Sequence, residues 1–143
     1  MITLVLDPSV AVKWAFPVAN GTLTNEALRL FQRYRDGEID FIVPDLFWAE
    51  MANVLRKAAR RGGWTRLDAE TVTGDFARCG FATVPSLELL SEATAIAFSH
   101  DRNIFECLYA ALAVQARANL ITADERLANA LAARFPVKWL GAF

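Results

Sequence analysis

Short apolar segments alternate with longer helix-forming stretches along the chain, and this alternation restricts the fold more than any other feature of the sequence. The apolar segments are residues 2–6, 41–43, 81–84, 119–122 and 137–140. Short, nearly continuous apolar runs are typical of strands that are buried on both faces. The stretches between them are long enough for right-handed crossovers, so the sequence predicts an α/β fold: a three-layer α/β/α sandwich with a central, mainly parallel five-stranded sheet.

The positions of the helices follow from apolar spacing and from turn and capping residues. The expected helices cover about residues 9–16, 25–35, 46–61, 65–78, 87–99, 104–118 and 124–134. The candidate N-caps are Thr24 or Asn25, Asp45, Ser86 and Asn103. Residues 17–21 form a break, and Gly62-Gly63 is a typical helix C-terminus. Because there is no repeat, low-complexity tract or linker, we expect residues 1–143 to form a single domain.

Composition excludes several classes of protein. Hydrophobic residues make up 55% of the 143 residues, which is too many for a disordered chain. No apolar run reaches the roughly 18 residues needed to span a bilayer, and the N-terminal segment lacks the charged region and cleavage site of a signal peptide. We therefore expect a cytoplasmic protein with no membrane partner, in which Cys79 and Cys107 are buried free thiols.

Aspartates follow two of the predicted strands. Asp7 ends the first strand, and Asp124 lies two residues beyond Thr122, where the fourth strand ends. In open α/β sheets, ligands bind beyond the carboxyl ends of the strands, near a topological switch point. If the two strands are neighbours, the two carboxylates meet at that edge. Either aspartate could instead simply cap the helix that follows it.

Two glutamates lie in the first turns of predicted helices and therefore near the same edge. Glu50 is surrounded by apolar residues, and Glu106 follows the candidate cap Asn103. Glutamate also favours helix N-termini electrostatically, so each glutamate alone is a weak signal. The hypothesis of a functional site depends on both glutamates together with Asp7 and Asp124.

A polar and basic stripe accompanies Glu50 on its helix. At 100° per residue from Glu50, Asn53 falls at about 300°, Lys57 at about 340° and Arg61 at about 20°. The net charge of −1 and the pI near 5.8 give no global signature of nucleic-acid binding. The stripe could be a solvated charge run, but cations aligned with a carboxylate also suit RNA, a polyanion, held beside a metal.

Other chemistries found on similar sheets lack their residues here. The chain has no GxGxxG or GxxxxGK[ST] phosphate-binding loop. Ser9 stands where a haloacid-dehalogenase-like phosphatase has its second aspartate, and Pro85 follows the third strand, where a receiver domain has its phosphoacceptor. His100 is the only histidine and is expected at a helix end or on the surface, so a zinc site or a two-histidine ribonuclease mechanism lacks its residues.

Four segments, in this order, resemble the PIN-domain family, and within it the VapC-type toxins of bacterial toxin–antitoxin pairs. They are Leu6-Asp7-Pro8-Ser9-Val10, Val43-Pro44-Asp45-Leu46 with Glu50-Met51-Ala52-Asn53-Val54-Leu55-Arg56, Phe105-Glu106-Cys107-Leu108-Tyr109-Ala110-Ala111-Leu112-Ala113, and Leu120-Ile121-Thr122-Ala123-Asp124-Glu125-Arg126-Leu127. Each segment is short, but all four in order form a fairly specific pattern that extends from the N-terminus to about residue 127.

The resemblance implies a PIN-like fold and Mg²⁺- or Mn²⁺-dependent cleavage of RNA. It also implies a homodimer, alone or in a larger toxin–antitoxin complex, and inhibition by a cognate antitoxin. By motif position, the catalytic residues would be Asp7, Glu50, Glu106 and Asp124. The metal ligands among them would be Asp7, Glu106 and Asp124, with Ser9 and Thr122 as supporting hydroxyls and Glu50 orienting or deprotonating the attacking water.

The chemistry of these side chains agrees with that expectation, with one departure. Carboxylate oxygens are hard ligands that select Mg²⁺ or Mn²⁺, and in-line attack by water would leave 5′-phosphate and 3′-hydroxyl ends. Glu106, however, stands where the family usually has aspartate, and the extra methylene could weaken metal binding or change the preferred metal. The alternative is a catalytically degenerate PIN-like module that binds RNA or a protein partner.

Overall fold

The computed structural model describes residues 1–16 and 22–143, so the break predicted at residues 17–21 lies outside the described residues. The strands are β1 (Ile2–Leu6), β2 (Ile39–Pro44), β3 (Ala82–Val84), β4 (Asn119–Thr122) and β5 (Val137–Trp139). The helices are α1 (Pro8–Ala15), α2 (Thr24–Arg35), α3 (Leu46–Gly62), α4 (Arg66–Ala77), α5 (Leu90–His100), α6 (Ile104–Ala116) and α7 (Glu125–Leu131), with short 3-10 helices η1 (Ser86–Leu89) and η2 (Leu140–Ala142).

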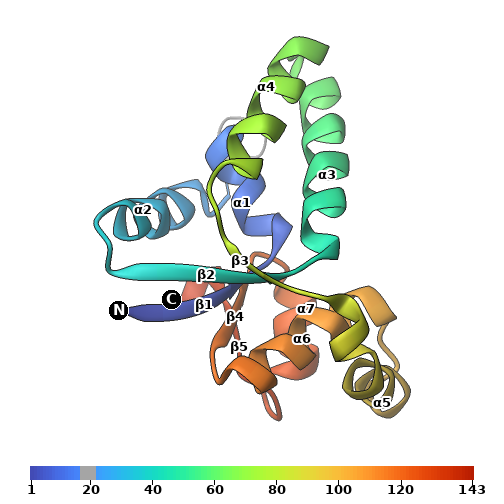
Figure 1. The fold of residues 1–143 in the computed structure, drawn as a ribbon. Coiled ribbons are helices and arrows are strands. Elements are labelled where there is room, and N and C mark those ends of the chain that lie inside the picture. The colour runs from blue at the N-terminus through green and yellow to red at the C-terminus, as the bar shows by residue number, and fades with distance from the viewer. Residues whose placement is uncertain (17–21) are drawn as a thin grey trace.

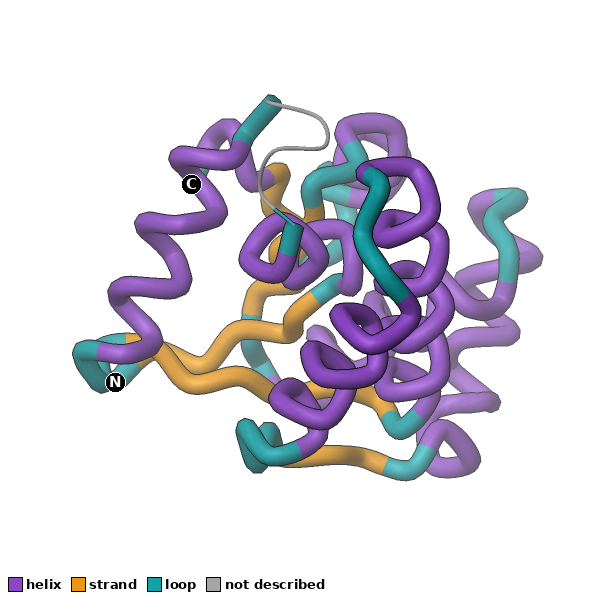
Figure 2. Tube along the Cα trace, turned by 90° about the horizontal axis from the view of Figure 1, so that it is seen from above, coloured by secondary structure: helices purple, strands orange, loops and turns teal. Residues whose placement is uncertain are grey.

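The five strands form one sheet in the order β3-β2-β1-β4-β5, and every neighbouring pair is parallel. Helices α1 to α4 cover one face of this sheet and α5 to α7 the other (Figure 1). Seen from above, helices lie over much of the sheet (Figure 2). The predicted three-layer α/β/α fold with a five-stranded parallel sheet is confirmed.

The core lies on both sides of β1, the central strand. Leu4, Val5 and Leu6 are fully buried, since helices pack against both faces of the strand. Below the sheet, α6 is buried over residues 107–113, a run that is apolar around the whole helix. A helix that is hydrophobic on all sides belongs in the interior. Each large aliphatic side chain buried in this way contributes roughly 1.5–3 kcal/mol.

The order of the strands creates one switch point. The chain passes from β1 to β2 on one side of the sheet and later returns to β4 on the other side of β1. Val5 pairs with Ile42 on one side, and Leu6 pairs with Ile121 on the other. Since all strands are parallel, their carboxyl ends meet at one edge, and the switch point between β1 and β4 lies on it.

The side chains of two predicted caps bond each other. The Oδ1 atom of Asp45 accepts hydrogen bonds from the backbone N–H of Ser86, at 3.1 Å, and from its hydroxyl. Asp45 stands at the predicted N-cap position of α3 but makes no side-chain capping bond, and the prediction is wrong for Ser86, which begins η1. This pair ties the end of β2 to the end of β3.

Other boundaries also differ from the prediction. α2 begins at Thr24 after Leu23, whose φ of 60° is left-handed, so neither Thr24 nor Asn25 is the N-cap. α6 ends two residues early because Arg117 has a φ of 52°. In contrast, Asn103 caps α6 and the left-handed Gly63 ends α3, as predicted, while Thr65, the predicted first residue of its helix, is the N-cap of α4.

The two cysteines are both free, but only Cys107 is buried; the prediction of burial is wrong for Cys79, which is exposed. His100 is the last residue of α5, as expected, and its ring packs edge-on against Phe135. Among the described residues, no helix has the length and apolar character needed to cross a membrane.

Candidate active site

Asp7 stands at the carboxyl end of β1, beside the switch point, and is partly buried. Its Oδ2 atom accepts a hydrogen bond from the hydroxyl of Ser9, in the first turn of α1, and another from Thr122, at 3.0 Å. Thr122 is the last residue of β4 and is fully buried. The two hydroxyls therefore hold one oxygen of the carboxylate, which leaves Oδ1 for a ligand.

The same hydroxyls fix the turn that carries Asp124. The Oγ of Ser9 accepts from the backbone N–H of Ala123 at 3.0 Å, and the Oγ1 of Thr122 accepts from that of Asp124 at 3.1 Å. Asp124 also caps α7, because its Oδ1 accepts from the N–H groups of Arg126 and Leu127. The capping interpretation is thus correct for Asp124, whereas Asp7 makes no capping hydrogen bond.

The electrostatics of Asp7 show that other acids lie near it. Burial raises the pKa of Asp7 above its ordinary value, and the hydrogen bonds from Ser9 and Thr122 oppose this rise. The negative charge of Asp124 raises the pKa of Asp7 further. A carboxylate in this setting favours a proton or a cation.

Glu50, in the second turn of α3, lies near Asp7 at the carboxyl edge of the sheet. Its Oε1 accepts a 2.6 Å hydrogen bond from the hydroxyl of Tyr109, which belongs to α6. Burial raises the pKa of Glu50, the Tyr109 hydrogen bond opposes that rise, and the charge of Asp7 adds to it. Asp7 therefore interacts electrostatically with two acids from other segments, Asp124 and Glu50, at this edge.

Glu106 has a different partner. Its Oε2 accepts from the Nε of Arg102 at 2.9 Å, and both side chains are only about a quarter exposed, at 26% and 25%. The Oδ1 of Asn103 caps the helix by accepting from the backbone N–H of Glu106. The fourth predicted acid thus lies in the first turn of α6, as expected, but its carboxylate is engaged in an ion pair.

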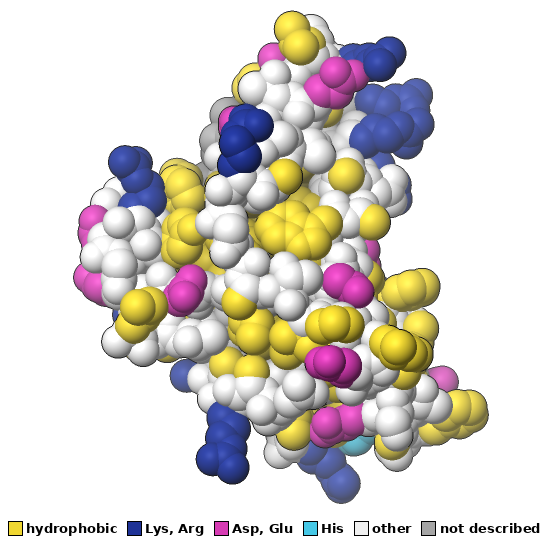
Figure 3. All heavy atoms as spheres, in the orientation of Figure 1, with side chains coloured by type: hydrophobic (Ala, Val, Ile, Leu, Met, Phe, Trp, Pro, Cys, Tyr) yellow, Lys and Arg dark blue, Asp and Glu magenta, His cyan; other side chains and the backbone are white. Residues whose placement is uncertain are grey.

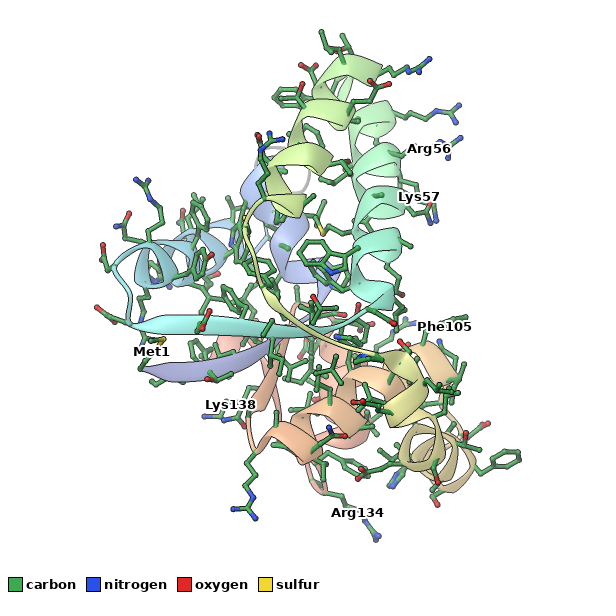
Figure 4. All side chains as sticks on the ribbon, in the orientation of Figure 1. Met1, Arg56, Lys57, Phe105, Arg134 and Lys138 are labelled. Atoms are coloured by element: carbon green, nitrogen blue, oxygen red, sulfur yellow. The ribbon has the colours of Figure 1, made fainter. Side chains whose placement is uncertain are left out.

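The polar stripe on α3 is exposed along its length. Asn53, Lys57 and Arg61 are all exposed. In Figure 4, Arg56 and Lys57 project outward from α3 on the same side of the molecule as Phe105, the neighbour of Glu106. Basic side chains gather over this outer side of α3 in Figure 3. At 1.5 Å per residue, Lys57 lies about 10 Å along the helix from Glu50.

Comparison with known families decides where this arrangement belongs. The model of the PIN domain family matches residues 4–131, which include Asp7, Glu50, Glu106 and Asp124. The chain belongs to the PIN domain family. Members of this family are generally nucleases. No curated protein matches the sequence.

Two solved structures share the fold of this PIN domain. PAE2754 from Pyrobaculum aerophilum is 16% identical, with a TM-score of 0.66 over 99% of this chain and 91% of its own. VapBC2 from Rickettsia felis, solved bound to a DNA fragment from its promoter, is 12% identical, with a TM-score of 0.60 over 96% of this chain and 98% of its own. At these identities the likeness concerns the fold.

The acids of the PIN domain fit a divalent cation by their chemistry. Asp7 and Asp124 offer carboxylate oxygens near each other, and their repulsion is relieved by a cation. Within residues 1–16 and 22–143, however, no three His, Cys, Asp or Glu side chains are gathered closely enough to form a complete metal site. Glu106, the third predicted ligand, forms an ion pair with Arg102.

Two residues of this site were not predicted from the sequence. Tyr109 is buried in the apolar run of α6, but its hydroxyl bonds Glu50. Arg102 lies in the loop before α6, four residues before Glu106, so their nearness in sequence was the one available signal for the pair. No local signal links Tyr109 to Glu50, which is 59 residues away.

Proposed function

We propose that this PIN domain is a Mg²⁺- or Mn²⁺-dependent endoribonuclease and the toxin of a toxin–antitoxin pair. The observation that supports this most directly is the setting of Asp7. It lies at the switch point of the sheet, two hydroxyls hold one of its oxygens, and it interacts electrostatically with both Asp124 and Glu50. Such an anionic edge suits a cation, which would in turn attract a phosphate group.

Each acid has a separate task in this proposal. Asp7 and Asp124 hold the metal, with Glu106 as a third ligand when its carboxylate leaves Arg102. Ser9 and Thr122 fix the orientation of Asp7. Glu50, with Oε1 bonded to Tyr109, uses its other oxygen to orient or deprotonate the water that attacks phosphorus. When bound, the divalent ion supplies Lewis-acid stabilisation of the charge on the phosphate.

The exposed residues Asn53, Lys57 and Arg61 form the proposed RNA contact on α3. Their side chains extend the site away from the acids, so an RNA strand can lie along α3 with its cleaved phosphate at the edge of the sheet. Phosphate contacts of this kind give affinity without sequence information. The expected products carry 5′-phosphate and 3′-hydroxyl ends.

A cognate antitoxin and a second toxin copy are the proposed protein partners. VapBC2 from Rickettsia felis, which shares the fold, carries the name of the VapC-type toxin–antitoxin pairs that the sequence resembles. In this chain, a cavity of about 580 Å³ between α3 and α4 has an apolar floor that includes Ala59 and Trp64 and a rim with Arg56, Arg60 and Arg66. An amphipathic antitoxin segment with acidic flanks would fit such a surface.

The proposal is tested by incubating the purified protein with total RNA in Mg²⁺ or Mn²⁺ and sequencing the cut ends. We expect cleavage that EDTA abolishes and that Asp7→Asn reduces at least about a hundredfold, whereas Glu92→Gln, an exposed acid on α5, leaves it unchanged. Equal cleavage in excess EDTA, or full activity of Asp7→Asn, contradicts the proposal.

A non-catalytic PIN-like module that binds RNA or protein is the second candidate. The Arg102–Glu106 ion pair favours it, because a carboxylate held by a guanidinium is less available to a metal. The two candidates differ in cells: induced expression of a nuclease toxin stops growth and Asp7→Asn relieves the arrest, while a binding module behaves the same with either residue.

A further inference from the structure

Tyr109 is a buried residue of α6 whose hydroxyl contacts a residue of the helical layer on the other face of the sheet. Only 2% of its surface is exposed, and its neighbours from residue 107 to residue 113 are all buried. A buried hydroxyl needs a hydrogen-bond partner, since leaving it unpaired costs free energy. Phenylalanine would fill the same space without that requirement, so the hydroxyl itself needs an explanation.

The partner of this hydroxyl is Glu50. The Tyr109 hydroxyl donates to Oε1 at 2.6 Å, a distance typical of a hydrogen bond to a charged carboxylate. Glu50 belongs to α3, above the sheet, and Tyr109 to α6, below it (Figure 1). The bond therefore passes around the carboxyl edge of the sheet and joins the two helical layers where Asp7 stands.

The hydrogen bond from Tyr109 engages Oε1 of Glu50 and leaves Oε2 for another interaction. Among the described residues, Tyr109 is the side chain that bonds Glu50, and it uses Oε1 alone. Glu50 is partly exposed whereas Tyr109 is buried, so solvent and substrate reach the glutamate but not the tyrosine. Burial and the nearby carboxylates also raise the pKa of Tyr109, so the phenol stays a donor.

We propose that Tyr109 is the positioning residue for Glu50: it fixes one carboxylate oxygen so that the other faces the attacking water. This inference rests on the proposed ribonuclease function. Tyr109 touches neither substrate nor metal in this account and acts only through Glu50. A side chain with several rotatable bonds is otherwise free to leave the productive orientation, and small misplacements of a catalytic group are costly.

The test compares Tyr109→Phe with Tyr34→Phe. Both variants remove one hydroxyl, but that of Tyr34 donates a long 3.5 Å bond to the carbonyl of Cys79, distant from the acids. We expect Tyr109→Phe to lower kcat about ten- to a hundredfold with KM within about twofold, and Tyr34→Phe to change neither. In the Glu50→Gln background, Tyr109→Phe should cause no further loss.

Three results would overturn the inference. The first is a kcat for Tyr109→Phe within twofold of the wild-type kcat. The second is a rise in KM as large as the fall in kcat. The third is that Tyr109→Phe lowers kcat by the same factor in the Glu50→Gln background as in the wild type. A crystal structure of each variant gives a readout that needs no activity: Glu50 should adopt one side-chain conformation in the wild type and several in Tyr109→Phe. If the wild type cleaves no RNA, the proposed function fails, and the conformation of Glu50 still decides the role of Tyr109.

Discussion

Arg102 donates through its Nε to the Oε2 of Glu106 at 2.9 Å, and the two side chains shield each other from most of the solvent. Aspartate at position 106, the residue usual in this family, would be one methylene shorter. The longer glutamate side chain reaches Arg102, which lies in the loop before α6. The pair therefore gives a physical meaning to the one position at which the acidic set departs from the pattern.

Removing Arg102 should change metal binding. In Arg102→Gln the carboxylate of Glu106 is no longer shared with a guanidinium, so we expect Mn²⁺ to bind several-fold more tightly, a change of about 1 kcal/mol. Isothermal titration calorimetry measures the affinity. Arg29→Gln, which breaks the ion pair with Glu26 on α2, is the control and should have no effect. An unchanged affinity in Arg102→Gln means that Glu106 does not face the metal.

Replacing Asp7 should stabilise the metal-free protein while removing its activity. Burial raises the pKa of Asp7 above its ordinary 3.8 in the folded state. The folded protein therefore holds this proton more tightly than the unfolded chain, and stability falls as the pH rises through the folded value. In EDTA at pH 7, Asp7→Asn should gain about 0.5–2 kcal/mol in the free energy of unfolding.

The pH dependence checks the cause of that gain. Below the ordinary pKa of 3.8, Asp7 is protonated in both states, so the advantage of Asp7→Asn over the wild type should disappear near pH 3. Urea unfolding at several pH values measures it, and Glu92→Gln serves as the control. A variant that is less stable than the wild type at pH 7 would show that the hydrogen bonds from Ser9 and Thr122 outweigh the cost of burial.

A divalent ion should stabilise the fold through Asp7 and Asp124. At a Mn²⁺ concentration ten times its Kd, the expected gain is about 1.4 kcal/mol, which a thermal shift assay detects as a higher Tm. Asp7→Asn and Asp124→Asn should each lose this shift, whereas Glu50→Gln should keep it, because Glu50 is assigned to the water and not to the metal. Loss of the shift in all three variants would move Glu50 into the ligand set.

Thr122 should contribute to both stability and activity. Thr122→Val keeps the shape but removes the hydroxyl that bonds Asp7 and accepts from the N–H of Asp124, so we expect a loss of about 1–3 kcal/mol. Thr73→Val is the matched control, since the Thr73 hydroxyl donates to the carbonyl of Ala69 in its own helix. Equal losses in both variants would contradict a special role for Thr122.

Much of the fold was predictable because its signals are local. Apolar runs ended by proline or aspartate located the strands, and Thr65, Asn103 and Gly63 marked helix ends through their own backbone bonds. The failures had causes that lie elsewhere in the chain. The Asp45 side chain makes no capping bond in α3 because its carboxylate accepts from Ser86, 41 residues away. β2 extends back to Ile39 because its pairing with β1 begins at Ile2.

The sequence predicted the positions of the candidate site residues in the fold but not the contacts between their side chains. The sequence indicated that Asp7, Glu50, Glu106 and Asp124 belong at one edge of the sheet, and each lies where its strand or helix predicts. The interactions between these acids, and the ion pair of Glu106 with Arg102, depend on the directions of the side chains. Tyr109 shows this limit most clearly, since an aromatic residue in an apolar helix gives no sign of its partner on another helix.

The hydrogen bond between Thr122 and Asp7 joins residues that are 115 positions apart in the sequence. During synthesis Asp7 is among the first residues made, yet its carboxylate gains this support only after β4 has emerged and paired with β1. Pairing between segments so distant in sequence forms slowly, because the long intervening chain must first be brought together. The acidic edge is therefore incomplete in any partly folded state in which β4 has not paired with β1.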